Sequence, residues 1–372
     1  MNCDKLKLAF KILEFWSVTL KAKKTIKAKI VHLTKVKQRL LEKEYKNLQR
    51  FLHGEKAEIY SANKQQAKRF YKEIKPYKEY PISIRKDLLK VERQNTKIAQ
   101  YWVRIPVSGR RGGIWVAIKP HCPIEPDMEI CESKLFKHNE EFFLHITVQK
   151  EVELKTDCNG VLAVDLGIHN IAVTVNSKTR KTSFYGKKIR AVRGHYFHLR
   201  RKLPNRKAVR KVGSHERSIV NHELHKISKA IVQEANQTNS AIVLGKLKGL
   251  RKNGKGKGRR FRRKLNNFPY HKLSNYIEYK ARWQGIPVLE ISEAYTSQTC
   301  SICGGKGLRR NGLFKCSCGA ELNADYNGAK NIMKRALGLV SRVGAAVNLP
   351  RTIPTDSLSP MMRMEAPSVR EG

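Results

Sequence analysis

Acidic residues are scarce in this chain. Its 372 residues include 31 Asp and Glu against 76 Lys and Arg, which gives a formal net charge of +45 and a sequence pI of about 10.2. So large an excess of one sign repels itself in a compact monomer, and it predicts a polyanionic partner such as nucleic acid. Aromatic residues make up 8% of the chain, so it can build hydrophobic cores and is not a disordered basic tail.

Long apolar runs are also absent. No apolar run approaches the roughly 18 residues of a membrane span, and the N-terminal segment LAFKILEFW is interrupted by Lys11 and Glu14. We therefore expect neither a transmembrane helix nor a signal peptide. Four cysteines without the spacing of metal ligands are interpreted as unpaired thiols in a reducing cytosol: Cys3, Cys122, Cys131 and Cys158.

The other four cysteines form two tight turns. Cys300 and Cys303 make a C-x-x-C turn, and Cys316 and Cys318 make a C-x-C turn. Four thiolates so arranged can surround one tetrahedral Zn²⁺. Two disulfides are the alternative, but close-set thiols in a chain without a secretion signal more often bind metal. Four thiolates leave no open coordination position, which predicts a structural zinc.

Two aspartates stand out near the ends of predicted elements. Asp165 lies in GVLAVDLGIHNIAV, where an apolar strand ends in Asp-Leu-Gly and a second apolar strand follows. That order is typical of the opening of an RNase H-like nuclease core. Asp325 follows Asn323, a predicted N-cap, in the first turn of a helix, where a carboxylate suits the helix dipole. No aspartate occurs between these two.

With these motifs the chain resembles the TnpB family. These RNA-guided nucleases of the OrfB type are carried by insertion sequences and are similar to compact type V CRISPR effectors and Fanzors. The resemblance covers roughly residues 142–337, in VDLGIHNIAV, AIVLGKLKGL, NNFPYHKLSNYIEYKARWQGIPVLEI, YTSQTC…CSCG and NADYNGAKNI. It implies a guide RNA from the element's end, a double-stranded DNA target next to a short flanking motif, and a cytoplasmic, nucleoid-associated location, or a nuclear one in a eukaryote.

The resemblance and the residue patterns together predict a multidomain α+β protein. Residues 1–158 are expected to form a wedge-type antiparallel β-barrel with a helical recognition insertion at about 33–95. Within it the apolar spacing predicts helices near 33–52, 59–74 and 85–93. An RNase H-like (RuvC) core is expected over 159–295 and 321–338, with a zinc ribbon at 296–320 and a disordered tail at 339–372. In the core, 188–236 is interpreted as one long helical passage and 265–284 as one helix.

The active site departs from the family pattern. Most relatives have a Glu at the end of the strand matching AIVLGKL, where this chain has Gly245 followed by Lys246. In one hypothesis the carboxylate is relocated to Glu293, and Asp165, Glu293 and Asp325 hold two Mg²⁺ or Mn²⁺ ions for phosphodiester hydrolysis. A Glu293 that follows the outer strand would lean over the end of the inner strand, where Gly245 leaves room.

Other hypotheses stay open. The site is disabled in one of them, which makes the protein an RNA-guided DNA-binding repressor with Lys246 where the metal belongs. Glu290 and Glu234 are rival ligands, although strand alternation predicts that Glu290 points to solvent or to a basic neighbour. That the chain is itself the transposase is disfavoured, because no short motif brings a Tyr and two His together.

Two basic segments predict nucleic-acid contacts. No acidic residue occurs from Leu166 through His215, and residues 251–264 carry nine cationic side chains in fourteen positions. Such a loop can follow a phosphate backbone but cannot specify a sequence; a solvated linker or a nuclear-import signal is the alternative. The predicted nucleic-acid-binding residues are Arg200, Arg201, Arg206, Lys207, Arg210, Arg251, Lys252, Arg259, Arg260, Arg262 and Arg263.

Overall fold

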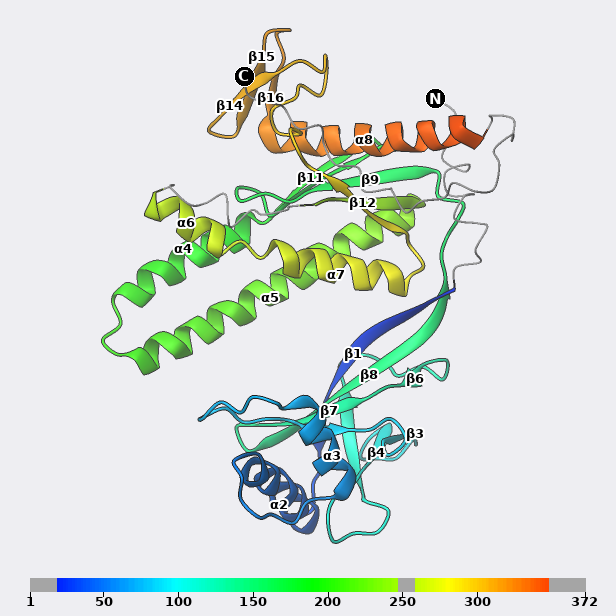
Figure 1. Ribbon diagram of the computed structural model, residues 1–372, viewed down its shortest axis with the longest axis vertical. Coiled ribbons are helices and arrows are strands. Elements are labelled where there is room, and N and C mark those ends of the chain that lie inside the picture. Colours follow the sequence, from blue (N-terminus) through cyan, green and yellow to red (C-terminus); the bar gives the residue numbers. More distant parts are fainter. Residues whose placement is uncertain (1–18, 247–257, 348–372) are drawn as a thin grey trace, which may run out of the picture.

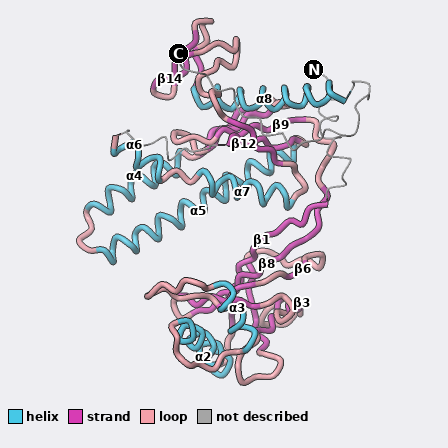
Figure 2. The backbone as a smooth tube through the Cα atoms, viewed as in Figure 1, coloured by secondary structure: helices cyan, strands magenta, loops and turns pink. Residues whose placement is uncertain are grey.

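The computed structural model describes residues 19–246 and 258–347, with the exception of the side chains of Arg260 and of 339–347. The chain forms two lobes, an N-terminal β-rich lobe and a larger α/β lobe that carries a small three-stranded ribbon (Figures 1 and 2). Among the helices described, none is long and apolar enough to cross a membrane. The predicted contacts of Arg251 and Lys252, and Cys3 of the predicted free thiols, lie outside the described residues.

The N-terminal lobe is an antiparallel sheet curled around one hydrophobic core. Its longest ladder pairs β1 (Thr19–Val31) with β8 (Glu141–Glu153), and alternate residues such as Ile26 and Ile146 are fully buried. The strand order is β2-β7-β8-β1-β5-β4-β3, with β6 paired to β8. The remaining strands are β2 (Ile82–Ile84), β3 (Lys90–Arg93), β4 (Tyr101–Ile105), β5 (Ile114–Pro120), β6 (Glu129–Ile130) and β7 (Ser133–His138).

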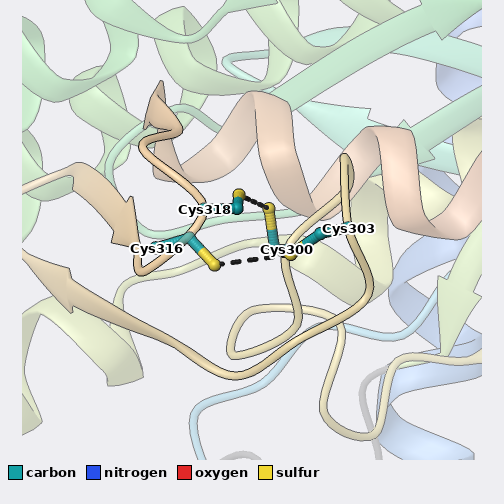
Figure 3. A group of neighbouring side chains, drawn as sticks. All are labelled: Cys300, Cys303, Cys316 and Cys318. Carbon is teal, nitrogen blue, oxygen red and sulfur yellow. Dashed lines mark hydrogen bonds between the residues drawn. The ribbon is translucent and has the colours of Figure 1, made fainter.

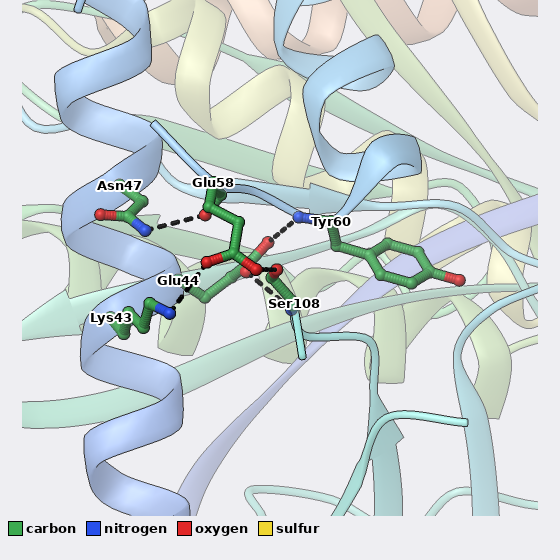
Figure 4. A network of polar contacts seen from close by, with 6 residues as sticks. All are labelled: Lys43, Glu44, Asn47, Glu58, Tyr60 and Ser108. Atoms are coloured by element: carbon green, nitrogen blue, oxygen red, sulfur yellow. Dashed lines mark hydrogen bonds and ion pairs between the residues drawn. The ribbon is translucent and has the colours of Figure 1, made fainter. Parts of the chain in front are cut away.

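Two helices, α2 (Lys35–Leu52) and α3 (Ser61–Phe70), follow the first strand, as predicted. A buried carboxylate fastens them to the sheet: Glu44 accepts hydrogen bonds from the backbone N–H groups of Tyr60 and Ser108 at 3.0 and 2.9 Å (Figure 4). Above it, the exposed Glu58 pairs with Lys43 at 3.0 Å and accepts a hydrogen bond from the Ser108 hydroxyl. A buried carboxylate without hydrogen-bond partners would cost free energy of folding. Glu44 therefore favours the backbone positions of Tyr60 and Ser108 that supply these partners.

The prediction of a third helix at 85–93 is wrong. These residues form a turn and then β3, in which Val91 pairs with Val103 of β4. The helical insertion therefore ends with α3 and does not extend to residue 95. The apolar run Leu88, Leu89 and Val91 is too short for periodicity to separate helix from strand, and the long-range pairing with β4 decides between them.

The second lobe is built on a five-stranded sheet of order β11-β10-β9-β12-β13. β10 is antiparallel to β9 and β11, whereas β12 is parallel to β9 and β13 is parallel to β12. The predicted RNase H-like arrangement is thus present, and the strand that contains Gly245 (β12) lies beside the strand that ends at Asp165 (β9). The strands are β9 (Gly160–Asp165), β10 (Ala172–Asn176), β11 (Thr182–Tyr185), β12 (Ser240–Lys246) and β13 (Val288–Ser292).

Helices cover both faces of this sheet. One face carries α8 (Ala324–Val347), and the other carries α5 (Arg206–Gln237) and α7 (Tyr270–Trp283) (Figure 1). Alternation along the strands assigns Ala163, Val243 and Ile291 to the α8 side, and Leu162, Ile242 and Val288 to the α5 side. The next odd positions, Asp165, Gly245 and Glu293, therefore fall toward α8.

Three boundaries differ from the predictions. The passage 188–236 is two helices, α4 (Lys187–Arg201) and α5, because the chain turns at Pro204 and Asn205 caps α5 with a 2.8 Å bond from Ala208 N–H. The helix predicted at 265–284 is likewise divided at Pro269 into α6 (Arg259–Asn266) and α7. The tail predicted from 339 is wrong for 339–347, which belong to α8, and 348–372 lie outside the described residues.

The ribbon connects β13 to α8. Its strands β14 (Gly307–Arg310), β15 (Leu313–Cys316) and β16 (Glu321–Asn323) form an antiparallel sheet around Phe314, which is fully buried. Two buried asparagines of α8 fasten the ribbon to the core. Asn327 accepts from Ser301 N–H and donates to Thr299 O at 2.8 Å each, and Asn331 donates to the carbonyl oxygens of Thr296 and Thr299.

Candidate active site and metal centre

The four cysteines predicted to bind zinc come together at one end of the ribbon (Figure 3). Their sulfur atoms all lie within 4.8 Å of one another, with Cys300 Sγ 3.8 Å from Cys318 Sγ and Cys303 Sγ 3.6 Å from Cys316 Sγ. Ligands placed about 2.3 Å from a tetrahedral zinc ion are about 3.8 Å apart. The cluster could therefore bind a metal such as zinc.

Backbone N–H groups already point at these sulfurs. Ile302 N–H and Gly305 N–H each donate to a cysteine sulfur, Cys300 and Cys303 respectively, at 3.4 Å. Burial opposes ionisation of Cys300, but donors from Cys303 and Ile302 outweigh it and lower the pKa of Cys300 to about 7. The turn thus favours the thiolate, which is the form that binds metal. Cys122, Cys131 and Cys158 are free thiols elsewhere.

Asp165 ends β9 on the side of the sheet that α8 covers. An added Cβ at Gly328 of α8 would lie only 2.7 Å from Asp165 Oδ2, so glycine at this position of α8 leaves the space that the carboxylate occupies. The motif NADYNGAKN thereby serves the site twice: Gly328 accommodates Asp165, and Asp325 of the first turn supplies a second carboxylate.

Glu293 follows β13 and lies over the end of β12, as the geometric prediction required. A Cβ added to Gly245 would lie 1.7 Å from Glu293 Oε1 and 2.4 Å from its Cδ. The Glu293 carboxylate therefore occupies the very space that a side chain at position 245 would need. Its Oε1 is buried and has no hydrogen-bond partner among the described residues, which is uncommon for a buried polar atom.

Asp325 is almost fully buried and is held from two sides. Asn170 Nδ2 donates to its Oδ2 at 2.8 Å, and Arg309 of β14 donates to its Oδ1 at 2.6 Å. Asn323 caps α8, because its Oδ1 accepts from the backbone N–H groups of Asp325 and Tyr326 at 3.0 and 3.1 Å. The N-cap prediction is confirmed, and it fixes the first turn that carries the carboxylate.

Burial and mutual repulsion disfavour ionisation of the Asp165 and Glu293 carboxyl groups. Burial, with a further contribution from Asp165, raises the pKa of Glu293 to about 8. Burial and the Asp325 charge raise the pKa of Asp165 to about 7, against the opposing effect of Arg309. A divalent cation would relieve this repulsion. Among the described residues, only the four cysteines place three or more possible metal-ligand atoms within 4.8 Å of one another. Carboxylates that serve two ions about 4 Å apart are expected to be more widely spaced.

Three residues at this site make contacts that no sequence pattern predicts. Arg335 of α8 donates to the carbonyl oxygens of Ser292 and Ala294 at 2.8 and 2.6 Å, and so holds the segment on both sides of Glu293. Arg309 and Asn170 hold Asp325. The contacts of Arg335 and Arg309 depend on how α8 and the ribbon lie against β13, which no local sequence pattern shows.

The rival carboxylates lie elsewhere. Glu290 pairs with Lys246 at 2.9 Å, so the predicted basic neighbour is found and Lys246 is engaged outside the carboxylate cluster. Glu234 is on α5, on the other side of the sheet, where burial raises its pKa. Of the predicted nucleic-acid contacts, Arg200 is paired with Glu216, and Arg201, Arg206, Lys207, Arg210, Arg259 and Arg262 are exposed.

Comparison with family models matches the part of the chain that contains Glu293, the four ribbon cysteines and Asp325. A family model described as "Cas12f1-like, TNB domain" covers residues 270–332. Over 129 residues the chain is 37% identical to the TnpB-like protein MJ0751 of Methanocaldococcus jannaschii, a match over 34% of this chain and 46% of that protein. These segments of the chain are similar to Cas12f1-like and TnpB-like proteins.

The chain is also similar to CRISPR-associated proteins. It is 33% identical over 222 residues to the CRISPR-associated endodeoxyribonuclease Cas12f2 of a Micrarchaeota archaeon, a match over 53% of this chain and 40% of that protein. The alignments therefore span less than half of the length of both curated relatives. A solved Cas12f1-sgRNA-target DNA complex aligns with a TM-score of 0.47 at 15% identity, over 72% of this chain and 67% of that one.

Proposed function

We propose that this protein is an RNA-guided DNA endonuclease that hydrolyses phosphodiester bonds at the Asp165, Glu293 and Asp325 site. The observation that carries the proposal is the position of Glu293. Its carboxylate fills the space beside Gly245, at the strand end where the sequence comparison with the family led us to expect a glutamate. A site in which the usual carboxylate had simply been lost would not need a second Glu in that place.

The residues present fit divalent metal. Glu293 Oε1 is a buried oxygen without a hydrogen-bond partner in the described part of the chain, and the pKa values of Glu293 and Asp165 are raised by burial and repulsion. Asp165, Glu293 and Asp325 would hold the ions through hard oxygen ligands, which suits Mg²⁺ or Mn²⁺. Two such ions, when bound, supply the charge that activates water and stabilises the leaving oxygen.

The side chains around the carboxylates keep them in position. Arg335 fixes the backbone on both sides of Glu293, and Asn170 and Arg309 hold Asp325. Arg309 is about one-third exposed, so its guanidinium can turn from Asp325 to a phosphate oxygen of a bound strand. It would then offset negative charge on the phosphate that is attacked.

The ribbon metal is proposed to be a structural Zn²⁺. Four cysteine ligands leave no open position for catalysis. The bonds from Asn327 and Asn331 to Thr296 and Thr299 connect the cluster to α8, so folding of the ribbon positions both Arg309 and the start of α8. Zinc would thereby support the carboxylate site without contacting it.

A guide RNA and a DNA duplex are the proposed partners. The relative named above as an endodeoxyribonuclease is CRISPR-associated, and the net charge of +45 favours a large polyanion. In such an arrangement base pairing with the guide selects the sequence, and the protein recognises heteroduplex shape and a short flanking motif. The proposed source of the guide is the end of a transposable element.

A DNA-binding repressor without cleavage is the second candidate, because Gly245 replaces the usual glutamate. Mg²⁺-dependent cleavage of a guide-matched duplex separates the two. The protein is purified with its co-expressed RNA, and wild type is compared with Asp165→Ala on targets with randomised flanks. Cleavage by wild type alone supports the nuclease. Tight binding without cleavage by wild type would instead establish repression by occupancy.

A further inference from the structure

A cavity of about 370 Å³ opens beside the turn that follows Asp165. We call it the α4–α6 cavity, because its walls come from Ile168 and His169 of that turn, from α4, and from the end of α6 through Pro269. Its volume lies in the range of about 300–1,000 Å³ that small-ligand sites occupy. The turn also carries Asn170, which bonds to Asp325, so the cavity and the carboxylates share one structural element.

The cavity has an apolar wall and a cationic lining. Ile171, Ile189 and Phe268 are buried behind it, and Phe197 contributes an aromatic ring. Arg190, Arg193, Arg263 and Lys264 also line it, and no lining residue is acidic. An apolar surface combined with several cations suits a ligand that has a flat apolar part and a negative charge, which describes a nucleotide.

Arg193 lacks a partner for its most enclosed atom. Its Nε is buried and makes no hydrogen bond to any described residue, and burial lowers the pKa of its guanidinium. The neighbouring cation is engaged differently, because Arg263 stacks 3.6 Å from the centroid of the Phe197 ring. A buried guanidinium donor without an acceptor is costly unless an anion completes the site.

The basic surface continues outward from this cavity. A second hollow is lined by Phe197, Arg201, Arg259 and Arg263, and a third by Arg259, Arg262 and Arg263 with Asn266 and Asn267. Successive phosphates of a strand could follow this series of cations while one base enters the cavity. The surface therefore fits a single strand better than a free mononucleotide.

We propose that the α4–α6 cavity binds one nucleotide of a single-stranded DNA segment, with its base against Phe197 and its phosphate on Arg193. The choice of DNA rests on the proposed nuclease function, since the strand that approaches the carboxylates is the one to be cut. This cavity is a binding site separate from the carboxylates. It would orient the single strand that is displaced from the DNA duplex next to Asp165. Stacking on an aromatic side chain is sequence-tolerant, as a programmable nuclease requires.

The test measures binding without cleavage. A short single-stranded DNA carrying the fluorescent base 2-aminopurine is titrated with full-length protein in buffer without Mg²⁺ or Mn²⁺ and without chelator, so that the ribbon metal is retained. Stacking in the cavity is expected to quench the fluorescence. Phe197→Ala is expected to weaken binding by about 5- to 100-fold, whereas Phe197→Tyr retains the ring and should bind as wild type. Phe184→Ala, at an exposed phenylalanine of β11, is the matched control.

A second variant fills the cavity without removing a charge or a ring. Gly194 lies in α4 on the cavity wall, and a Cβ there meets nothing within 4 Å. Gly194→Leu should therefore fold, with equal or higher helix stability, and still weaken binding and abolish the quenching. Arg193→Gln should lower affinity and its salt dependence, while Arg110→Gln in the exposed β4–β5 turn should change neither.

Several results would overturn the proposal. Wild-type affinity in Phe197→Ala and Gly194→Leu would show that the strand does not enter the cavity. Loss of binding in Phe197→Ala alone, with Gly194→Leu unaffected, would make Phe197 a support for Arg263 only. Quenching with an RNA probe but not with DNA would assign the cavity to the guide. A wild type that binds as expected yet never cuts would refute the nuclease function and leave this site in place.

Discussion

The four ribbon cysteines and the three carboxylates are both clusters whose members repel one another when ionised, but the chain builds them differently. Residues 300–318 contain all four sulfurs, and backbone N–H groups of the same turns point at them. The carboxylates come from positions 165, 293 and 325 and meet only because β9, β12 and β13 are neighbours under α8. The first cluster is local, whereas the second is a product of topology.

Loss of one cysteine should have the largest effect. Cys300→Ser removes a buried ligand, so zinc content should fall and the free energy of unfolding should decrease by at least ~2 kcal/mol. Cleavage should be lost as well, because the ribbon positions Arg309 and the start of α8. Metal analysis and thermal unfolding measure the two effects. Cys131→Ser, at a free thiol of the N-terminal lobe, should keep its zinc, and an unchanged zinc content in Cys300→Ser would refute the assignment.

Gly245→Ala should separate the carboxylates from the zinc centre. The new Cβ would lie 1.7 Å from Glu293 Oε1, so the flexible Glu293 side chain must move away. We expect cleavage to fall by about 100-fold, the effect of misplacing one ligand at a two-metal site, with zinc content and stability nearly unchanged. Gly338→Ala, on α8 where a Cβ meets nothing, should cut as wild type. Full activity in Gly245→Ala would show that Glu293 is not required where it lies.

The difference between the local cysteine cluster and the carboxylates brought together by topology also explains which residues the sequence could predict. The cysteine cluster follows from spacing alone, and Asp165 and Asp325 follow from the strand end and the helix start. Glu293 needed the strand order as well. The contacts of Arg309 and Arg335 could not be predicted, because they depend on how the ribbon and α8 lie against β13. No local sequence pattern encodes that packing. The helix wrongly predicted at 85–93 has the same origin, since pairing with β4 decides its structure.

Arg335 offers a smaller perturbation of the carboxylate cluster. Arg335→Gln removes the bonds to the carbonyl oxygens of Ser292 and Ala294, so Glu293 should lose its fixed position without losing its charge. We expect kcat to fall by about 10-fold and a higher Mg²⁺ concentration to be needed for half-maximal cleavage. Lys334→Gln, an exposed neighbour on α8, should leave both quantities unchanged. Equal Mg²⁺ requirements in the two variants would show that Arg335 does not position Glu293.

The smallest effect concerns pH. In the folded protein the pKa values of Glu293 and Asp165 are raised to about 8 and about 7, above their ordinary values of 4.5 and 3.8. Their contribution to stability is therefore present below about pH 4 and is lost as pH rises through 7 to 8. Without Mg²⁺ or Mn²⁺, and with the ribbon metal retained, Tm should fall by roughly 2–4 °C between pH 5 and pH 8.

Two comparisons test the origin of this pH effect. Glu293→Gln cannot ionise, so its Tm without Mg²⁺ or Mn²⁺ should depend less on pH than that of the wild type. Because metal displaces protons from these groups, Mg²⁺ should bind more tightly as pH rises over the same range. If Tm depended on pH equally in Glu293→Gln and in the wild type, the assignment of the raised pKa values to the carboxylate cluster would be contradicted.

The most direct test of the relocated carboxylate compares Glu293→Ala with Glu290→Ala in Mg²⁺-dependent cleavage of a guide-matched duplex. The two residues lie three positions apart, but Glu290 is paired with Lys246 and Glu293 covers Gly245. The relocated site predicts that wild type and Glu290→Ala cut, whereas Glu293→Ala binds the duplex and does not cut. Cleavage by Glu293→Ala at the wild-type rate would contradict it.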